Sequence, residues 1–244
     1  ALGVHSQALQ LLGRLDEAQT AAQAALALWR GDQPLERAGL LDQLQAIEYQ
    51  RGQPQKALVL ARQSAALFAL HGDRRSIARG HHRIGTLLLV SGDADGGAVE
   101  LKRARQMAAE MRLVEQERDS IINIIKVHAD RGEARQMLVL ADEGWNLSPT
   151  FARPRIRQIL LQARAHACNL LGDLGECLVL AEQFLAESAA VGEPVGRQYA
   201  VLALLEFLVY LGEFDRCRAL LEELAQADTA QLAYLGVKLG FGHT

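Results

Sequence analysis

The sequence predicts an all-α fold, an α-solenoid of about six antiparallel helix pairs. A column of glycines repeats at a nearly constant interval, 39 residues once and 40 residues thereafter: Gly13, Gly52, Gly92, Gly132, Gly172 and Gly212. Apolar stretches with helical spacing precede and follow each glycine. A fixed period in this range is typical of stacked supersecondary units. The composition agrees, because half of the residues are hydrophobic and only 5% are aromatic, which suits helix-on-helix packing.

Each glycine fits the turn inside a helix pair. The left-handed conformation that ends a helix is open to glycine because it has no Cβ. A carboxylate often follows directly, where it favours the positive end of the next helix; these residues are Asp93, Glu133, Asp173 and Glu213. Five positions after the glycine comes a mostly small residue, which lets two helices approach closely: Ala18, Ala57, Gly97, Met137, Cys177 and Cys217.

The first half of the chain divides at clear breaks. We expect helices at 2–12, 15–30, 35–51, 54–71, 74–91 and 94–112. Pro34 precedes the third of them, and Pro54 stands where a first-turn proline is harmless. The 54–71 segment shows a pairing face at helical spacing that includes Ala57, Ala61 and Phe68.

The second half continues the same pattern. We expect helices at 114–131, 134–147, 155–171, 174–190, 195–211 and 214–226. Ser148 and Pro149 end one helix, and Gly192 to Pro194 form another break. A last helix at about 228–239 is interpreted either as a cap or as the opening of a further repeat.

These turns resemble the tetratricopeptide repeat (TPR). The segment 12–18, Leu-Gly-Arg-Leu-Asp-Glu-Ala, has the family's turn glycine, the apolar residue two further on and the alanine five further on. Gly85, seven residues before Gly92, matches an earlier family glycine. A later small position matches at Ala25, Ser64, Ala104 and Gly144 but not at Phe184 and Leu224, so we expect the last two repeats to pack differently. The resemblance implies a right-handed superhelix.

The period of 40 departs from the family's usual value of about 34 residues. The extra residues predict longer helices, as in the TPR-like arrays of bacterial MalT-type regulators, some signalling ATPases and peptide-pheromone receptors. The unbroken register predicts one solenoid over residues 1–244. Because Ala1 already lies in a helical stretch without an initiator Met, we expect the chain to be a fragment of a longer protein.

Charge and cysteine content narrow the expected setting. The net charge of −3 gives no bulk attraction to nucleic acid or to an anionic membrane, so neither is an expected partner. The longest apolar run, 199–211, is interrupted by Glu206 and is too short to span a bilayer. Three cysteines without a CxxC spacing argue against a disulfide framework. We therefore expect a reducing, cytoplasmic location.

By the resemblance, the first helices of successive pairs line a concave groove. The groove-facing positions of the family lie 13, 10, 9, 6, 3 and 2 residues before each turn glycine. Carried over to this chain, they give Asp42, Gln43 and Tyr49 from pair 2, Thr86 from pair 3 and nine predicted partner-binding residues: Arg79, His82, Arg83, Asn123, Lys126, His166, Asn169, Tyr199 and Tyr210.

Three features of this set predict the partner. Arg79, Arg83 and Lys126 would form a cationic patch. The amides of Asn123 and Asn169 would hold a peptide backbone. Tyr199 and Tyr210 would contribute to an apolar end: Tyr199, Leu202, Val209 and Tyr210. This map predicts a protein or peptide ligand with an acidic group and a hydrophobic segment. The alternatives are that the patch is a solvated helix face, and that helix 228–239 or a second copy covers the apolar end.

The sequence contains no motif that names a reaction. It lacks the GxxxxGK[ST], HExxH and GxSxG patterns. His81 and His82 are adjacent, so on a helix they point apart and do not share a metal ion. We therefore expect no enzyme activity, no metal and no cofactor.

The leading hypothesis is a non-catalytic protein-binding or peptide-binding scaffold that uses the concave groove. One alternative is an effector-sensing regulatory module of a larger bacterial transcription regulator or signalling ATPase. Another is a self-association element, which forms a homodimer through helix 195–211 or the C-terminal helix.

Overall fold

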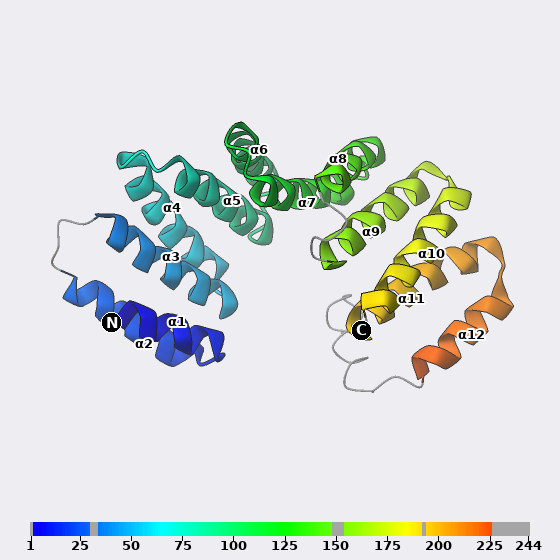
Figure 1. Ribbon diagram of the computed structural model, residues 1–244, viewed down its shortest axis with the longest axis horizontal. Coiled ribbons are helices and arrows are strands. Elements are labelled where there is room, and N and C mark those ends of the chain that lie inside the picture. The colour runs from blue at the N-terminus through cyan, green and yellow to red at the C-terminus, as the bar shows by residue number, and fades with distance from the viewer. Residues whose placement is uncertain (1, 30–33, 148–153, 192–193, 226–244) are drawn as a thin grey trace. The chain divides into compact units, whose positions relative to one another are not determined.

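The computed structural model describes residues 2–29, 34–147, 154–191 and 194–225, and the regular elements of this part of the chain are twelve α-helices (Figure 1). They are α1 (Leu2–Leu11), α2 (Leu15–Leu28), α3 (Pro34–Gln50), α4 (Pro54–Leu70), α5 (Arg74–Val90), α6 (Ala94–Glu110), α7 (Val114–Asp130), α8 (Ala134–Asn146), α9 (Pro154–Leu171), α10 (Leu174–Val191), α11 (Pro194–Leu211) and α12 (Phe214–Ala225). All twelve expected helices are confirmed, with ends within two residues. The helix expected at 228–239 lies outside the described residues.

Contacts between backbones divide the chain into two compact units, residues 1–127 and residues 128–244. In the first unit, each helix from α1 to α6 packs on the next one along the chain. In the second unit, α8 to α12 do the same. Packing between consecutive helices is what a repeat architecture requires. A single solenoid over residues 1–244 stays a prediction, and each unit is described by itself.

The six turn glycines adopt the left-handed conformation that their spacing predicts, with φ between 68° and 90°. In these turns the residue after the glycine donates its N–H to a carbonyl five positions back, as Asp93 does to Leu88 over 2.9 Å. The side chains of Asp93 and Asp173 then accept the N–H of Gly96 and Glu176, over 2.9 Å and 3.1 Å. These aspartates therefore end one helix and begin the next.

The glutamates at this position behave differently. Glu133 makes no capping bond, and its carboxylate contacts the imidazole of His128 instead. The longer glutamate side chain passes the amide groups that an aspartate reaches. The predicted role of the carboxylate as a capping acceptor therefore applies to the aspartates.

A second series of turns joins one pair to the next. Gly72, between α4 and α5, has φ 68°. Forty residues later, between α6 and α7, Arg112 holds the same conformation with φ 53°, and it is the one non-glycine residue with positive φ in the described backbone. The turn geometry is therefore kept where the glycine is lost.

The small residues predicted to let helices approach are buried in every pair: Ala18, Ala57, Gly97, Met137, Cys177 and Cys217. The closest approach joins α5 to α6 at Gly85 and Gly97. A Cβ on Gly85 would lie 3.0 Å from the carbonyl oxygen of Gly97 and 2.7 Å from Cγ of Leu101. Gly85 is thus required by packing. The larger Phe184 is also buried, where earlier pairs have a small residue.

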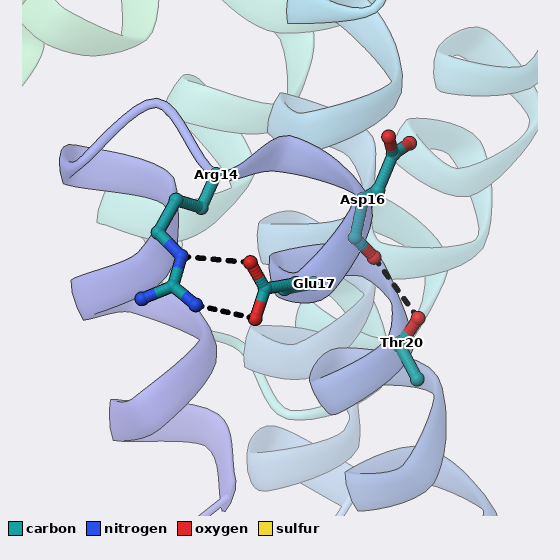
Figure 2. A network of polar contacts seen from close by, with 4 residues as sticks. All are labelled: Arg14, Asp16, Glu17 and Thr20. Carbon is teal, nitrogen blue, oxygen red and sulfur yellow. Dashed lines mark hydrogen bonds and ion pairs between the residues drawn. The ribbon is translucent and has the colours of Figure 1, made fainter.

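Ion pairs fix the first turn and connect it to the second. Figure 2 shows Arg14 gripping Glu17 through two parallel bonds, from Nε and Nη2, of 2.7 Å and 2.6 Å. In the same figure Thr20 donates its hydroxyl to the carbonyl of Asp16, and the Asp16 carboxylate pairs with Arg51 in the turn after α3. No helix in the described ranges is long and apolar enough to cross a bilayer.

An arginine ties three helices together in the second unit. The guanidinium carbon of Arg157, on α9, lies 3.9 Å from the centroid of the Trp145 ring on α8. The same guanidinium donates to both carboxylate oxygens of Glu187 on α10, over 3.1 Å and 3.4 Å. A planar guanidinium serves both contacts at once, because it stacks on the ring and pairs at its edge.

Candidate functional site: two cavities on the first helices

The first cavity lies between α3 and α5, the first helices of the second and third pairs. Its volume is about 290 Å³ and its wall is mostly apolar. The side chains that line it are Gln45, Ala46, Tyr49, Gln50, His82, Arg83, Thr86 and Leu87. All belong to the first unit, so one compact body builds the whole cavity.

The second cavity lies between α5 and α7, with one residue from α6 at its edge. Its volume is about 190 Å³, and it is lined by Ala78, Arg79, His82, Arg83, Ala104, Gln116, Asp119 and Ser120. His82 and Arg83 of α5 line both cavities. We call the two cavities, with these two residues between them, the trough.

Arg83 is already paired within the chain. Its guanidinium contacts the carboxylate of Asp42 on α3. Asp42 also accepts a bond of 3.0 Å from the hydroxyl of Ser64 on α4. Arg83 therefore brings a compensated cation to the trough, held in place by a network that spans α3, α4 and α5.

His82 presents a neutral ring to the trough. Its Nδ1 lies 3.1 Å from the Ser120 hydroxyl, which donates its own proton to the carbonyl of Gln116 over 2.9 Å. Nδ1 must therefore be the donor toward Ser120, and Nε2 is left as a hydrogen-bond acceptor. Burial lowers the pKa of His82 below its ordinary value; the nearby Asp119 opposes this effect and Arg83 reinforces it.

The two adjacent histidines of α5 point to different neighbours, as helical geometry predicts. Nδ1 of His81 lies 2.5 Å from the Glu100 carboxylate on α6. His82 contacts Ser120 on α7. The pair therefore connects α5 to helices on two sides.

The structure gathers only part of the predicted cationic patch. Arg79 and Arg83 both line the α5–α7 cavity, and Arg79 also donates to the Ser76 hydroxyl over 2.9 Å. Lys126 is exposed on α7 and is not among the residues that line either cavity. Asn123 spends one amide proton on Thr86, over 3.3 Å, so it bridges α7 and α5.

The remaining predicted residues belong to the second unit. His166 is exposed and Asn169 half-buried on α9. The backbones of Tyr199 and Tyr210 lie in α11, but their side chains fall outside the described part of the structure. Their predicted roles in partner binding stay predictions.

Several trough residues were missed by the sequence reading. Asp119 stands 13 residues before Gly132, the same offset that gives Arg79, so the offset rule contains the signal for it. Gln45 and Gln116 carry no such signal because they lie between the groove-facing positions. The Gln116 Oε1 atom is buried and has no hydrogen-bond partner in the described residues. It therefore offers the α5–α7 cavity a second free acceptor beside His82.

Comparison with known proteins places the fold. No family model and no curated protein matches the sequence. Among solved structures, the chain is similar to a putative kinesin light chain with nearly identical TPR-like repeats from Podosopora anserina, with a TM-score of 0.66, 19% identity, and coverage of 84% of this chain and 99% of that one.

Two bacterial structures are similarly close. PilF of Pseudomonas aeruginosa gives a TM-score of 0.67 at 14% identity over 97% of this chain and 96% of that one. Aspartyl phosphate phosphatase F of Bacillus subtilis gives 0.65 at 14% identity over 99% of this chain and 70% of that one. The helix pairs, the turn glycines and these likenesses together show that the chain has the TPR-like helical-repeat fold.

Proposed function

We propose that this chain is a non-catalytic binding module that holds an extended segment of a partner polypeptide in the trough. The observation that carries the proposal is the pair of cavities on α3, α5 and α7, joined by His82 and Arg83. Helical repeats create extended surfaces of this kind. Cavities of about 290 Å³ and 190 Å³ fall at or below the small end of the range for drug-sized ligands, so they favour side-chain anchors of a larger partner.

The chemistry of the trough defines the segment that fits. The mostly apolar α3–α5 cavity takes a hydrophobic side chain, and Tyr49 at its edge adds aromatic contact. Nε2 of His82 and Oε1 of Gln116 accept hydrogen bonds from the partner's N–H groups. A carboxylate on the partner binds Arg79 and competes with Asp42 for Arg83. We therefore keep the acidic group of the predicted ligand.

The effector-sensing alternative and the self-association alternative make other demands. A sensor module of a larger bacterial regulator would bind a small molecule and raise the midpoint of thermal unfolding without any peptide. A homodimer through α11 or the segment 228–239 would leave the trough unused. All three cysteines are buried and free, which fits our proposal of a cytoplasmic location.

Selection from a displayed library of random peptides tests the proposal. The purified chain serves as the target, and Arg83→Glu serves as the counter-target. We expect enriched peptides that combine an acidic residue with a bulky apolar one and that lose binding to Arg83→Glu. The control is Arg75→Glu, an exposed site in the first turn of the same helix that lines neither cavity. Peptides that bind both variants equally, or no enrichment at all, would contradict the proposal.

A further inference from the structure

The second helices carry an exposed column of valines. Val59, Val99, Val139 and Val179 stand seven residues after successive turn glycines and are exactly 40 residues apart. Their exposed fractions are 56%, 50%, 59% and 57%. A single exposed valine is ordinary, but one in every repeat from α4 to α10 forms a regular apolar feature. The trough uses the first helices, so this column belongs to a different surface.

The charge beside the column changes sign along the chain. Three residues after each valine, on the same helix face, come Arg62 and Lys102 in the first unit and Asp142 and Glu182 in the second. All four are exposed. In the described residues, neither Arg62 nor Lys102 pairs with a carboxylate. Asp142 and Glu182 contact Arg164 and Arg216, but about half of each carboxylate side chain remains exposed, at 56% and 47%.

Two of these helices are near copies with opposite charge. Segment 57–63 of α4 reads Ala-Leu-Val-Leu-Ala-Arg-Gln, and segment 177–183 of α10 reads Cys-Leu-Val-Leu-Ala-Glu-Gln. All basic residues of α4 and all acidic residues of α10 are unopposed in their own helix, because α4 has no Asp or Glu and α10 has no Lys or Arg. The same apolar face is therefore presented once with a cation and once with an anion.

We propose that the valine column is a self-association surface, on which α4 and α6 of one chain dock against α10 and α8 of a second copy. In this arrangement Arg62 meets Glu182 and Lys102 meets Asp142, while the valines cover one another. Each copy offers both faces, so two such contacts related by a twofold axis close a dimer, which is the commonest form of homo-oligomer. Like charges would meet if the copies ran in the same direction, so the sign change also fixes the antiparallel order.

Paired charge reversals test this arrangement by sedimentation velocity. One variant is Arg62→Glu/Lys102→Glu, and the other is Asp142→Lys/Glu182→Lys. We expect each alone to weaken dimerisation at least about tenfold. An equimolar mixture of the two should restore a dimer that contains one copy of each, because every contact is again between opposite charges. Thermal unfolding of each variant checks that it is folded.

Valine variants separate apolar contact from charge. Val99→Ser/Val139→Ser removes two central valines, and Val90→Ser/Val209→Ser removes two equally exposed valines from first helices. Only the first pair should weaken the dimer, and about 1 M salt, with a Debye length of about 3 Å, should weaken the wild-type dimer as well. A wild-type chain that stays monomeric up to about 0.1 mM overturns the proposal. So does a dimer that persists equally in both charge-reversed variants.

Discussion

At the scale of single residues, Arg112 holds a conformation that its neighbours in the repeat assign to glycine. Its φ of 53° matches that of Gly72 forty residues earlier. For a residue with a Cβ, the left-handed conformation costs roughly 1–2 kcal/mol. We expect Arg112→Gly to raise the free energy of unfolding by up to about 1 kcal/mol, after the extra entropy of glycine in the unfolded chain is subtracted.

Urea unfolding measures this change, and Gly72→Ala is its mirror control. That substitution places a Cβ in the same left-handed conformation, with no heavy atom within 4 Å of it. We expect it to lower the free energy of unfolding by about 1 kcal/mol through backbone strain alone. An Arg112→Gly chain that is less stable than wild type would show that the arginine side chain has a role beyond the turn.

His82 makes the stability of the first unit depend on pH. Because burial lowers the pKa of His82, the unfolded chain takes up a proton at about pH 6.5 that the folded chain does not. The native state therefore loses stability as the pH falls below about 6.5, until the lower pKa of the folded state is reached. We expect His82→Asn to make the free energy of unfolding fall less between pH 7 and pH 5.

Urea unfolding at three pH values tests this prediction. At pH 8 both states are neutral at this site, so the difference between wild type and His82→Asn gives the cost of substitution that does not depend on pH. An unchanged slope between pH 7 and pH 5 would mean that His82 is as easily protonated in the folded chain as in the unfolded one.

At the scale of helices, the contact between α5 and α6 depends on two glycines. A Cβ on Gly85 would lie 2.7 Å from Cγ of Leu101 and 3.1 Å from the backbone nitrogen of the same residue. We expect Gly85→Ala to lower the free energy of unfolding by about 1–3 kcal/mol, because the two helices must separate. Gly39→Ala on α3 is the matched control, since a Cβ there meets nothing within 4 Å.

The control should change in the opposite direction. Alanine favours a helix over glycine by about 1 kcal/mol, so Gly39→Ala should stabilise the chain. Thermal unfolding of the two variants side by side makes the comparison. Equal effects of the two alanines would show that the close approach at Gly85 does not limit packing.

Arg157 is the corresponding device between helices of the second unit. Arg157→Lys keeps the charge but loses the planar group that stacks on Trp145 and pairs with both oxygens of Glu187. We expect a loss of about 1–2 kcal/mol in the free energy of unfolding and a shift in tryptophan fluorescence. Arg218→Lys, in an exposed pair with Asp215, should change stability by less than about 0.5 kcal/mol. A loss no larger than in this control would contradict the proposed clamp.

The sequence was sufficient for the helices and their turns, because the signals are local. Gly92 and Asp93 specify a turn wherever they stand, and the period repeats that signal six times. The trough was only partly predictable. The offset rule finds Arg79, His82 and Arg83, but it does not reveal that Asp42 neutralises Arg83. That contact depends on how closely α3 and α5 approach, which no local pattern encodes.

At the scale of the whole molecule, the account assigns two surfaces to two sets of helices. The first helices α3, α5 and α7 form the trough for a partner, and the second helices α4, α6, α8 and α10 carry the valine column. The column was visible in the sequence as a 40-residue repeat of valine. It acquires meaning only with burial, because periodicity alone does not separate a valine in the core from one in solvent.

The most direct test of the central claim is a fluorescence anisotropy titration of a selected peptide against two tryptophan variants. Ala46→Trp fills the α3–α5 cavity, whereas Ala66→Trp places the same side chain at an exposed site on α4 that lines neither cavity. We predict that Ala46→Trp weakens binding at least about tenfold, a change of about 1.4 kcal/mol, and that Ala66→Trp binds like wild type. Equal affinity of all three chains would show that the partner does not enter the trough.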